Sequence, residues 1–266
     1  MERKFRTKCF LVIAQAVLLI SAMNTNAAAA GLFGAPQTRS RESGGLNTAI
    51  GYWHHEDTYK NGADHKIRQN EIYSQAAYGA NNVWEVYARV GVSDLKMFDA
   101  FNSSDAATET GKNNFEENWK FSGTLGAKGF YPIHKAFGIG AFIQGTYSFS
   151  NFTDEVAGTS GGTSFTTDLK VKNLWDVNFG VGFQATIPHD IKLYAGPYVY
   201  YSKAEVSSAA KIAGLEYTAG NVSVENKSRA GGFAGIDMPL AKGFHLNVEG
   251  QYSDRLSAGA AVTYRY

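Results

Sequence analysis

Cysteine, proline and long apolar runs are all scarce in this chain of 266 residues. The single cysteine, Cys9, lies within the first 30 residues, so the remainder of the chain contains none. An exported protein without cysteine is not one of the small secreted scaffolds that disulfides hold together. After residue 30 no apolar run approaches the ~20 residues that a membrane helix requires. If the protein crosses a membrane, strands must make the crossing.

The first 30 residues have the three parts of a secretory signal peptide. MERKFRTK is basic, CFLVIAQAVLLISAM is apolar, and NTNAAAA ends in small residues. We expect cleavage within residues 27–31, which places the mature terminus near Gly31. Removal of this segment leaves 21 basic and 23 acidic residues, a formal charge of −2 in place of +1. This balance does not suggest a nucleic-acid partner.

The chain is rich in glycine and aromatic residues, with 29 Gly, 15 Tyr and 17 Phe, and its mean hydropathy is −0.25. Apolar and polar residues alternate in its last part, where Phe244, Leu246 and Val248 are interleaved with His245 and Asn247. Successive side chains of a strand face opposite ways, so each such strand has one apolar and one polar face. Alternating strands average to mild hydropathy, which is why membrane barrels escape hydropathy windows.

Ten segments carry this alternation, and short turns alternate with long polar loops between them. The segments are residues 46–55, 67–79, 83–95, 119–131, 137–149, 171–187, 191–202, 227–238, 244–253 and 256–266. We predict a closed antiparallel transmembrane β-barrel over residues 46–266, most simply of ten strands, with eight as the alternative. Short turns on the periplasmic side and long extracellular loops are typical of outer-membrane barrels. Residues 31–45 have no period and predict a periplasmic linker. In the first strand either Ile50 and Tyr52 or Ala49 and Trp53 form the apolar side.

Aromatic residues at the ends of the apolar faces predict two interfacial girdles. The opposite faces carry charges, which predict a network inside the lumen: Glu71, Glu85, Arg89, Lys120, Lys128, Asp176, Lys192, Arg229, Asp237, Glu249 and Arg265. Paired and hydrogen-bonded charges are tolerated in an interior, whereas unpaired ones are costly. A narrow conduction path with Tyr194, Tyr198 and Tyr200 as its constriction is the alternative.

The leader, the Pro-bearing turns and the closing GFHLNVEGQYSDRLSAGAAVTYRY resemble the small OmpA-like and opacity-type porin-family barrels. This resemblance implies a place in the outer membrane of a two-membrane bacterium, in contact with lipid and lipopolysaccharide. It also implies recognition by the barrel-assembly machinery through the C-terminal strand, with Tyr264 and Tyr266 as the assembly signal. Several barrels of this group have eight strands.

Sites for chemistry are few in the sequence. His54 and His55 with Asp64 and His65 flank the first outer loop, but strand neighbours face opposite ways, and a protease-like pair needs residues on one face. We therefore predict no metal, no cofactor and no enzymatic activity, with a protease or lipid-modifying barrel as the alternative. The long loops carry Phe98, Phe101, Phe115, Phe152 and Phe165, and loops on rigid scaffolds often bind ligands. The expected function is structural, surface-binding or that of a minor pore.

Overall fold

The computed structural model shows an all-β protein, and the residues it describes are 31–38, 44–61, 63–81, 83–102, 108–160, 162–212, 215–218 and 220–266. The predicted signal peptide, residues 1–30, lies outside the described residues. In the part of the chain that the structure describes, no helix has the length and hydropathy of a membrane span. The strands are β1 Gly45–Asn61, β2 Ala63–Ala80, β3 Trp84–Met97, β4 Thr108–Thr110, β5 Phe115–His134, β6 Phe137–Ser148, β7 Phe152–Ser160, β8 Thr163–Ile187, β9 Ile191–Ile212, β10 Leu215–Thr218, β11 Val222–Asn226, β12 Ala230–Ala241, β13 Phe244–Tyr252 and β14 Leu256–Arg265, and the 3-10 turn η1 Pro188–Asp190 joins β8 to β9.

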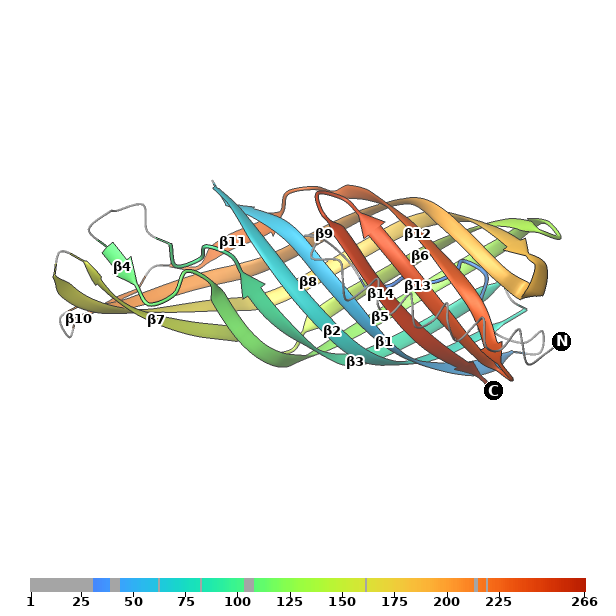
Figure 1. Cartoon of the computed structure of the whole chain (residues 1–266), viewed down its shortest axis with the longest axis horizontal. Helices are drawn as coiled ribbons and strands as arrows, with labels where there is room; N and C mark the ends of the chain where they lie inside the picture. The colour runs from blue at the N-terminus through green and yellow to red at the C-terminus, as the bar shows by residue number, and fades with distance from the viewer. Residues whose placement is uncertain are drawn as a thin grey trace, which may run out of the picture.

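Ten of these strands form a closed ring in the order β1, β2, β3, β5, β6, β8, β9, β12, β13, β14, with every pair antiparallel. The ring closes where β14 pairs with β1, from Arg265 opposite Asn47 to Ala258 opposite His54. Figure 1 shows the strands wound obliquely around one long barrel, with the C terminus at the end opposite β4, β7 and β10. The prediction of a closed antiparallel barrel of ten strands is confirmed.

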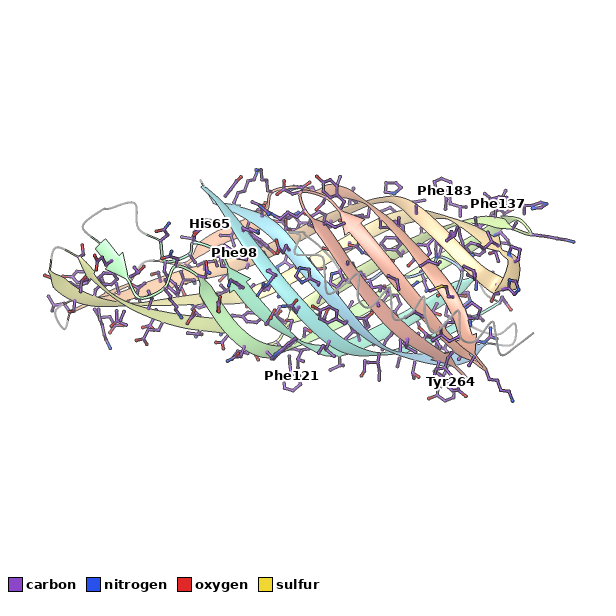
Figure 2. All side chains as sticks on the ribbon, viewed as in Figure 1. His65, Phe98, Phe121, Phe137, Phe183 and Tyr264 are labelled. Atoms are coloured by element: carbon purple, nitrogen blue, oxygen red, sulfur yellow. The ribbon has the colours of Figure 1, made fainter. Side chains whose placement is uncertain are left out.

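Large apolar side chains cover the outside of the barrel over the half of its length that lies nearest the C terminus. On β3, Trp84, Val86 and Val90 are exposed, whereas Glu85 and Arg89 between them are buried. Figure 2 shows Phe121, Phe137 and Phe183 projecting outward from their strands, and these side chains are 63%, 59% and 58% exposed. A polar interior inside an apolar outer band is the arrangement of a barrel that spans a membrane.

The first strand, whose facing the sequence left open, directs Ile50 to the outside and Ala49 and Trp53 to the inside. The reason is the neighbouring strand β14, where Gly259 leaves room for the indole. A Cβ atom at Gly259 would lie 2.3 Å from Cε3 of Trp53. The apolar pattern alone did not distinguish the two faces, because the inward face carries the large apolar side chain of Trp53 and the outward face carries Ile50.

The strands run well beyond the apolar band at the outer end, where the sequence predicted loops. β1 and β2 stay paired from Gly45 opposite Gly79 to Asn61 opposite Ala63, so the prediction of a polar loop over residues 56–66 was wrong. Similarly, β8 pairs with β9 as far as Phe165 opposite Ile212. Outside the lipid a strand needs no apolar outer face, because water solvates polar side chains there.

Along a single strand the environments of the two faces exchange. At the outer end of β3, Asp94 and Lys96 take the outer positions, while Leu95 and Met97 point inward and are buried. We call the part of the barrel beyond the apolar band, built from the outer ends of β1, β2, β3, β5, β8 and β9 together with β7, the outer extension. Its interior is an apolar cluster of Tyr59, Ile67, Leu95, Met97, Phe101, Phe115, Phe152, Val156, Val171, Leu174 and Ala204. Three of the loop phenylalanines proposed for ligand contact therefore form a core.

Candidate functional site

The predicted lumen charges divide into three groups in the structure. Glu85, Arg89, Lys192, Asp237 and Glu249 are buried inside the barrel. Glu71, Lys128 and Asp176 are partly buried, and each lines an internal cavity. Of the remaining three, Arg229 and Arg265 are exposed, and Lys120 is partly buried but lines neither cavity.

Ion pairs account for part of the internal network. Lys128 Nζ lies 3.3 Å from Glu85 Oε1, and Lys192 Nζ lies 3.5 Å from Asp190 Oδ1. Arg89 is held mainly by uncharged groups, since its guanidinium lies over the rings of Tyr73 and Tyr87 at 4.7 and 4.8 Å. Neutral donors, acceptors and rings thus share the task of holding these charges.

Arg229, Lys120 and Arg265 do not join this network. The side chain of Arg229 is 65% exposed, pairs with Glu225 at 2.8 Å and lies over the ring of Tyr201. Lys120 pairs with Glu117 at 3.6 Å, where β5 leaves the apolar band, and Arg265 is exposed at the last position of β14. Alternation correctly separates faces, but it does not reveal where a strand passes out of the barrel's interior.

The segment Gly31–Thr38, which we call the N-terminal plug, lies inside the barrel. The amide groups of Phe33 and Gly34 donate to the two carboxylate oxygens of Glu249, at 2.9 and 2.8 Å. Arg89 Nη2 donates to the carbonyl of Leu32 at 2.6 Å, and Gln144 Nε2 donates to that of Gly31 at 2.9 Å. The backbone of the plug is therefore bonded to groups on several walls of the lumen.

Phe33 anchors the plug among aromatic rings. Its ring stacks on Phe142 at a centroid distance of 3.8 Å and meets Tyr198 and Phe233 edge-on at 5.4 and 5.3 Å. Only 2% of Phe33 is exposed. Tyr194, Tyr198 and Tyr200, the predicted constriction, are buried in this same aromatic cluster, so they form the wall around the plug.

Two inward glycines make room for Pro36. A Cβ atom at Gly140 would lie 2.7 Å from Cβ of Pro36, and one at Gly182 would lie 2.9 Å from its Cγ. The prediction of a periplasmic linker over residues 31–45 is thus wrong for the plug. Aperiodic backbone has no strand pattern, and its polar groups here are satisfied by lumen side chains. The overlooked signal was the presence of Phe142 and Phe233 on faces that otherwise carry polar residues.

The outer extension contains a second feature, an apolar cavity of about 210 Å³ that we call the vestibule pocket. Its walls come from β1, β2, β3, β8, β9 and β11 and from the segments beside β3 and β11. The lining residues are Tyr59, His65, Ile67, Leu95, Met97, Ala100, Leu169, Val171, Leu174, Ala204, Val206, Ser208, Gly220, Val222 and Val224. Figure 2 shows His65 near the outer end of the barrel. The pocket therefore lies beyond the lipid-facing band and above the polar lumen.

The histidines singled out in the sequence do not form one constellation. His54 faces outward with Nδ1 2.8 Å from Asn70 Oδ1, whereas His65 lines the vestibule pocket. Asp64 pairs with Lys227. Among the described residues no group of three or more His, Cys, Asp or Glu side chains is placed to hold a metal ion.

No family model matches the sequence, and no curated protein matches it. Several solved barrels are similar in shape. The translocator domain of autotransporter NalP from Neisseria meningitidis is 12% identical, with 84% of this chain and 88% of that chain covered and a TM-score of 0.47. The outer membrane protease OmpT from Escherichia coli is 12% identical, with 89% and 99% covered and a TM-score of 0.42. The toluene transporter TbuX from Ralstonia pickettii is 12% identical, with 84% and 90% covered and a TM-score of 0.42. Likeness at these values establishes no shared function, and the resemblance to OmpA-like and opacity-type barrels stays a prediction.

Proposed function

We propose that this protein is an outer-membrane barrel of a two-membrane bacterium that binds small apolar molecules in the vestibule pocket. The observation that carries the proposal is the apolar lining of a cavity that opens inside the extracellular end of a barrel. Ligand sites are concave, mostly apolar and equipped with few polar groups. Here the polar side chains in the lining are those of Tyr59, His65 and Ser208.

The size of the pocket indicates the class of ligand. An apolar protein cavity of about 150 Å³ stays dry and binds benzene. The vestibule pocket, at about 210 Å³, therefore has room for one aromatic ring with a few additional carbons or for two fused rings. Because the lining has no Lys, Arg, Asp or Glu, a charged ligand would lose its hydration without a partner.

The position of the plug favours binding over conduction. Gly31–Thr38 occupies the lumen below the pocket and is bonded to Glu249, Arg89 and Gln144. A molecule in the vestibule pocket thus has filled lumen beneath it. The role that fits these contacts is capture at the cell surface, with the minor pore as the less favoured possibility.

Methyl NMR of the barrel in lipid nanodiscs tests the proposal with naphthalene as the probe. We expect saturable shifts for the methyl groups of Ile67, Leu95 and Met97, which line the pocket. Ala204 lines the pocket and is 2% exposed, so the carbons added in Ala204→Leu fill part of the cavity. Binding of naphthalene to this variant should weaken about tenfold.

The matched control is Ala88→Leu, which adds the same carbons on the lipid-facing side of β3. It separates pocket binding from partition of naphthalene into the nanodisc, and its binding should equal that of the wild type. Equal affinity in all three proteins, or shifts that rise linearly without saturation, would contradict the proposal.

The proposed role is not enzymatic. His54 is held by Asn70 on the outer face, and His65 lies in an apolar setting without a neighbouring acid among the lining residues. General acid and base chemistry needs both partners within hydrogen-bond reach of one proton. Peptide or phospholipid hydrolysis by the purified barrel that is lost in His65→Ala would reject this part of the proposal.

Lipid, lipopolysaccharide and the barrel-assembly machinery are the further partners that we propose. The C-terminal strand presents Tyr264 and Tyr266, whose ring centroids lie 4.9 Å apart, and Phe244 lies 4.7 Å from Tyr264. Deletion of Tyr266 should lower the amount of heat-modifiable barrel recovered from outer membranes, whereas Tyr252→Ala, at the other end of β13, should not. Equal recovery of the deletion variant would remove the support for an assembly signal.

A further inference from the structure

A small polar chamber lies beside Gly31, between the plug and the vestibule pocket. It has a volume of about 50 Å³, room for one or two water molecules. Its lining is Gly31, Trp53, His55, Gln69, Glu71, Ser93, Ser122, Thr146, Ser148, Leu174, Asp176, Tyr200 and Ser202. The charged pair Glu71 and Asp176 is therefore accompanied by no Lys or Arg in this lining.

The two carboxylates have neutral partners. Ser122 Oγ donates to Glu71 at 2.8 Å, and Asn178 Nδ2 donates to Asp176. Among the described residues neither acid has an ion pair with a basic side chain within 4.0 Å. Buried charges without an opposite charge are costly, so a cation in this chamber would stabilise both acids. His55 is the one side chain of the lining that can itself become positive.

Gly31 stands where such a cation would be useful. A Cβ atom on Gly31 would lie 4.0 Å from Glu71 Oε2 and 3.1 Å from Arg89 Nη1. Arg89 directs its guanidinium to the carbonyl of Leu32 and to Gln75, at 2.6 and 2.8 Å. Gly31 therefore lies beside one guanidinium and one carboxylate, in a chamber whose lining adds the carboxylate of Asp176 and the imidazole of His55. With both acids ionised and His55 neutral, a net charge of −1 remains around Gly31.

We propose that the α-ammonium group of the mature chain, freed by signal cleavage before Gly31, is bound inside the barrel by Glu71 and Asp176. Cleavage supplies the missing charge, and the ammonium has three donors for the oxygens of the chamber. Gln144 and Gln251 hold the carbonyl of Gly31 at 2.9 and 3.4 Å, which fixes the residue beside the acids. Export processing thus completes the site that holds the plug. The proposal is independent of any ligand in the vestibule pocket.

Amine acetylation of the intact barrel tests this site. Protein purified from outer membranes is treated with a water-soluble succinimidyl ester, and modification of the terminal α-amine is followed by mass spectrometry. We expect a chain that begins at Gly31 and an α-amine that reacts at least about tenfold more slowly in the folded than in the unfolded protein, equivalent to one unit of pKa or more.

Glu71→Gln together with Asp176→Asn should remove most of this protection. Glu116→Gln together with Asp154→Asn, which removes two carboxylates of the outer extension that do not line the chamber, should leave it intact. Migration on an unheated gel identifies the folded fraction of each variant. The wild-type measurement stands by itself if the double variant does not fold. A mature chain that begins elsewhere, a rapidly acetylated α-amine, or protection that persists in folded E71Q/D176N would overturn the proposal.

Discussion

Phe33→Ala should release the N-terminal plug. The side chain of Phe33 is 2% exposed and contacts the rings of Phe142, Tyr198 and Phe233, so its removal forfeits both apolar burial and ring packing. Replacement of a buried phenylalanine by alanine costs about 3 kcal/mol at the low end of its range. Every 1.4 kcal/mol is tenfold in an equilibrium, so the undocked population should rise about 100-fold.

The absence of cysteine after residue 9 provides a clean assay for this change. Ala35→Cys places one thiol in the plug at a position that is 3% exposed. When docking is fast compared with labelling, the rate of reaction with a soluble maleimide follows the undocked population. We expect F33A/A35C to label about 100-fold faster than A35C alone, by the energy difference given above.

Phe183→Ala in the A35C background is the control, because Phe183 is 58% exposed on the lipid-facing side. It removes the same ring from the outside of the barrel and should leave the labelling rate unchanged. Equal rates for A35C and F33A/A35C would refute the assignment of Phe33 as the anchor of the plug. Equal acceleration by both alanine variants would show general destabilisation of the barrel.

Two further changes test other contacts. Glu249→Gln keeps an acceptor for the amides of Phe33 and Gly34 but loses the charge, about 1.5 kcal/mol, so A35C labelling should accelerate about tenfold; an unchanged rate would contradict this role. Asp57, in the outer extension beyond the lipid-facing band, has its pKa raised to about 8, mainly because burial disfavours the charged carboxylate. Since the folded pKa exceeds the unfolded value of 3.8, the stabilising proton is fully held below pH 3.8 and stability falls as the pH rises toward 8. Asp57→Asn should flatten this dependence in hydrogen exchange of β1 and β9, and a slope equal to that of the wild type would contradict the assignment.

The ring of strands was predictable because lipid and lumen impose opposite demands on alternate residues. On β3, Trp84 and Val86 face outward while Glu85 and Arg89 face inward, as the two-residue period requires. A shift of one residue would exchange every side chain between the two environments, so the period also fixes the register. Where the alternation is clear, as on β3, fold and facing therefore follow from local sequence. On β1 the facing did not.

The outer extension was less predictable because its inward face is apolar and its outward face is polar, the opposite of the lipid-facing band. Leu95 and Met97 face inward and Lys96 outward, so the period continues while the meaning of each face changes. Glu56 and Lys66, which pair at 3.5 Å, occupy positions of β1 and β2 where a lipid-facing strand would have apolar residues. A search for strands with an apolar outer face therefore assigns this part of the chain to a loop. The vestibule pocket lies in this part and was not foreseen.

The plug was not predictable from its own residues. Its place depends on contacts with residues more than 100 positions away, such as Gln184 Oε1, which accepts from the amide of Gln37 at 3.0 Å. No period marks such a segment, because its irregular backbone contacts several walls of the barrel at once. The inward aromatic residue Phe233 was the local trace of the cluster that receives it.

The sequence distance between the plug and its partners bears on how this protein is made. Phe33 and Glu249 are 216 positions apart, and β14, the last strand, is the one that pairs with β1. The plug can therefore complete its contacts only after β13, which carries Glu249, has been synthesised. Closure of the ring and completion of the plug's contacts therefore both depend on the last two strands of the chain.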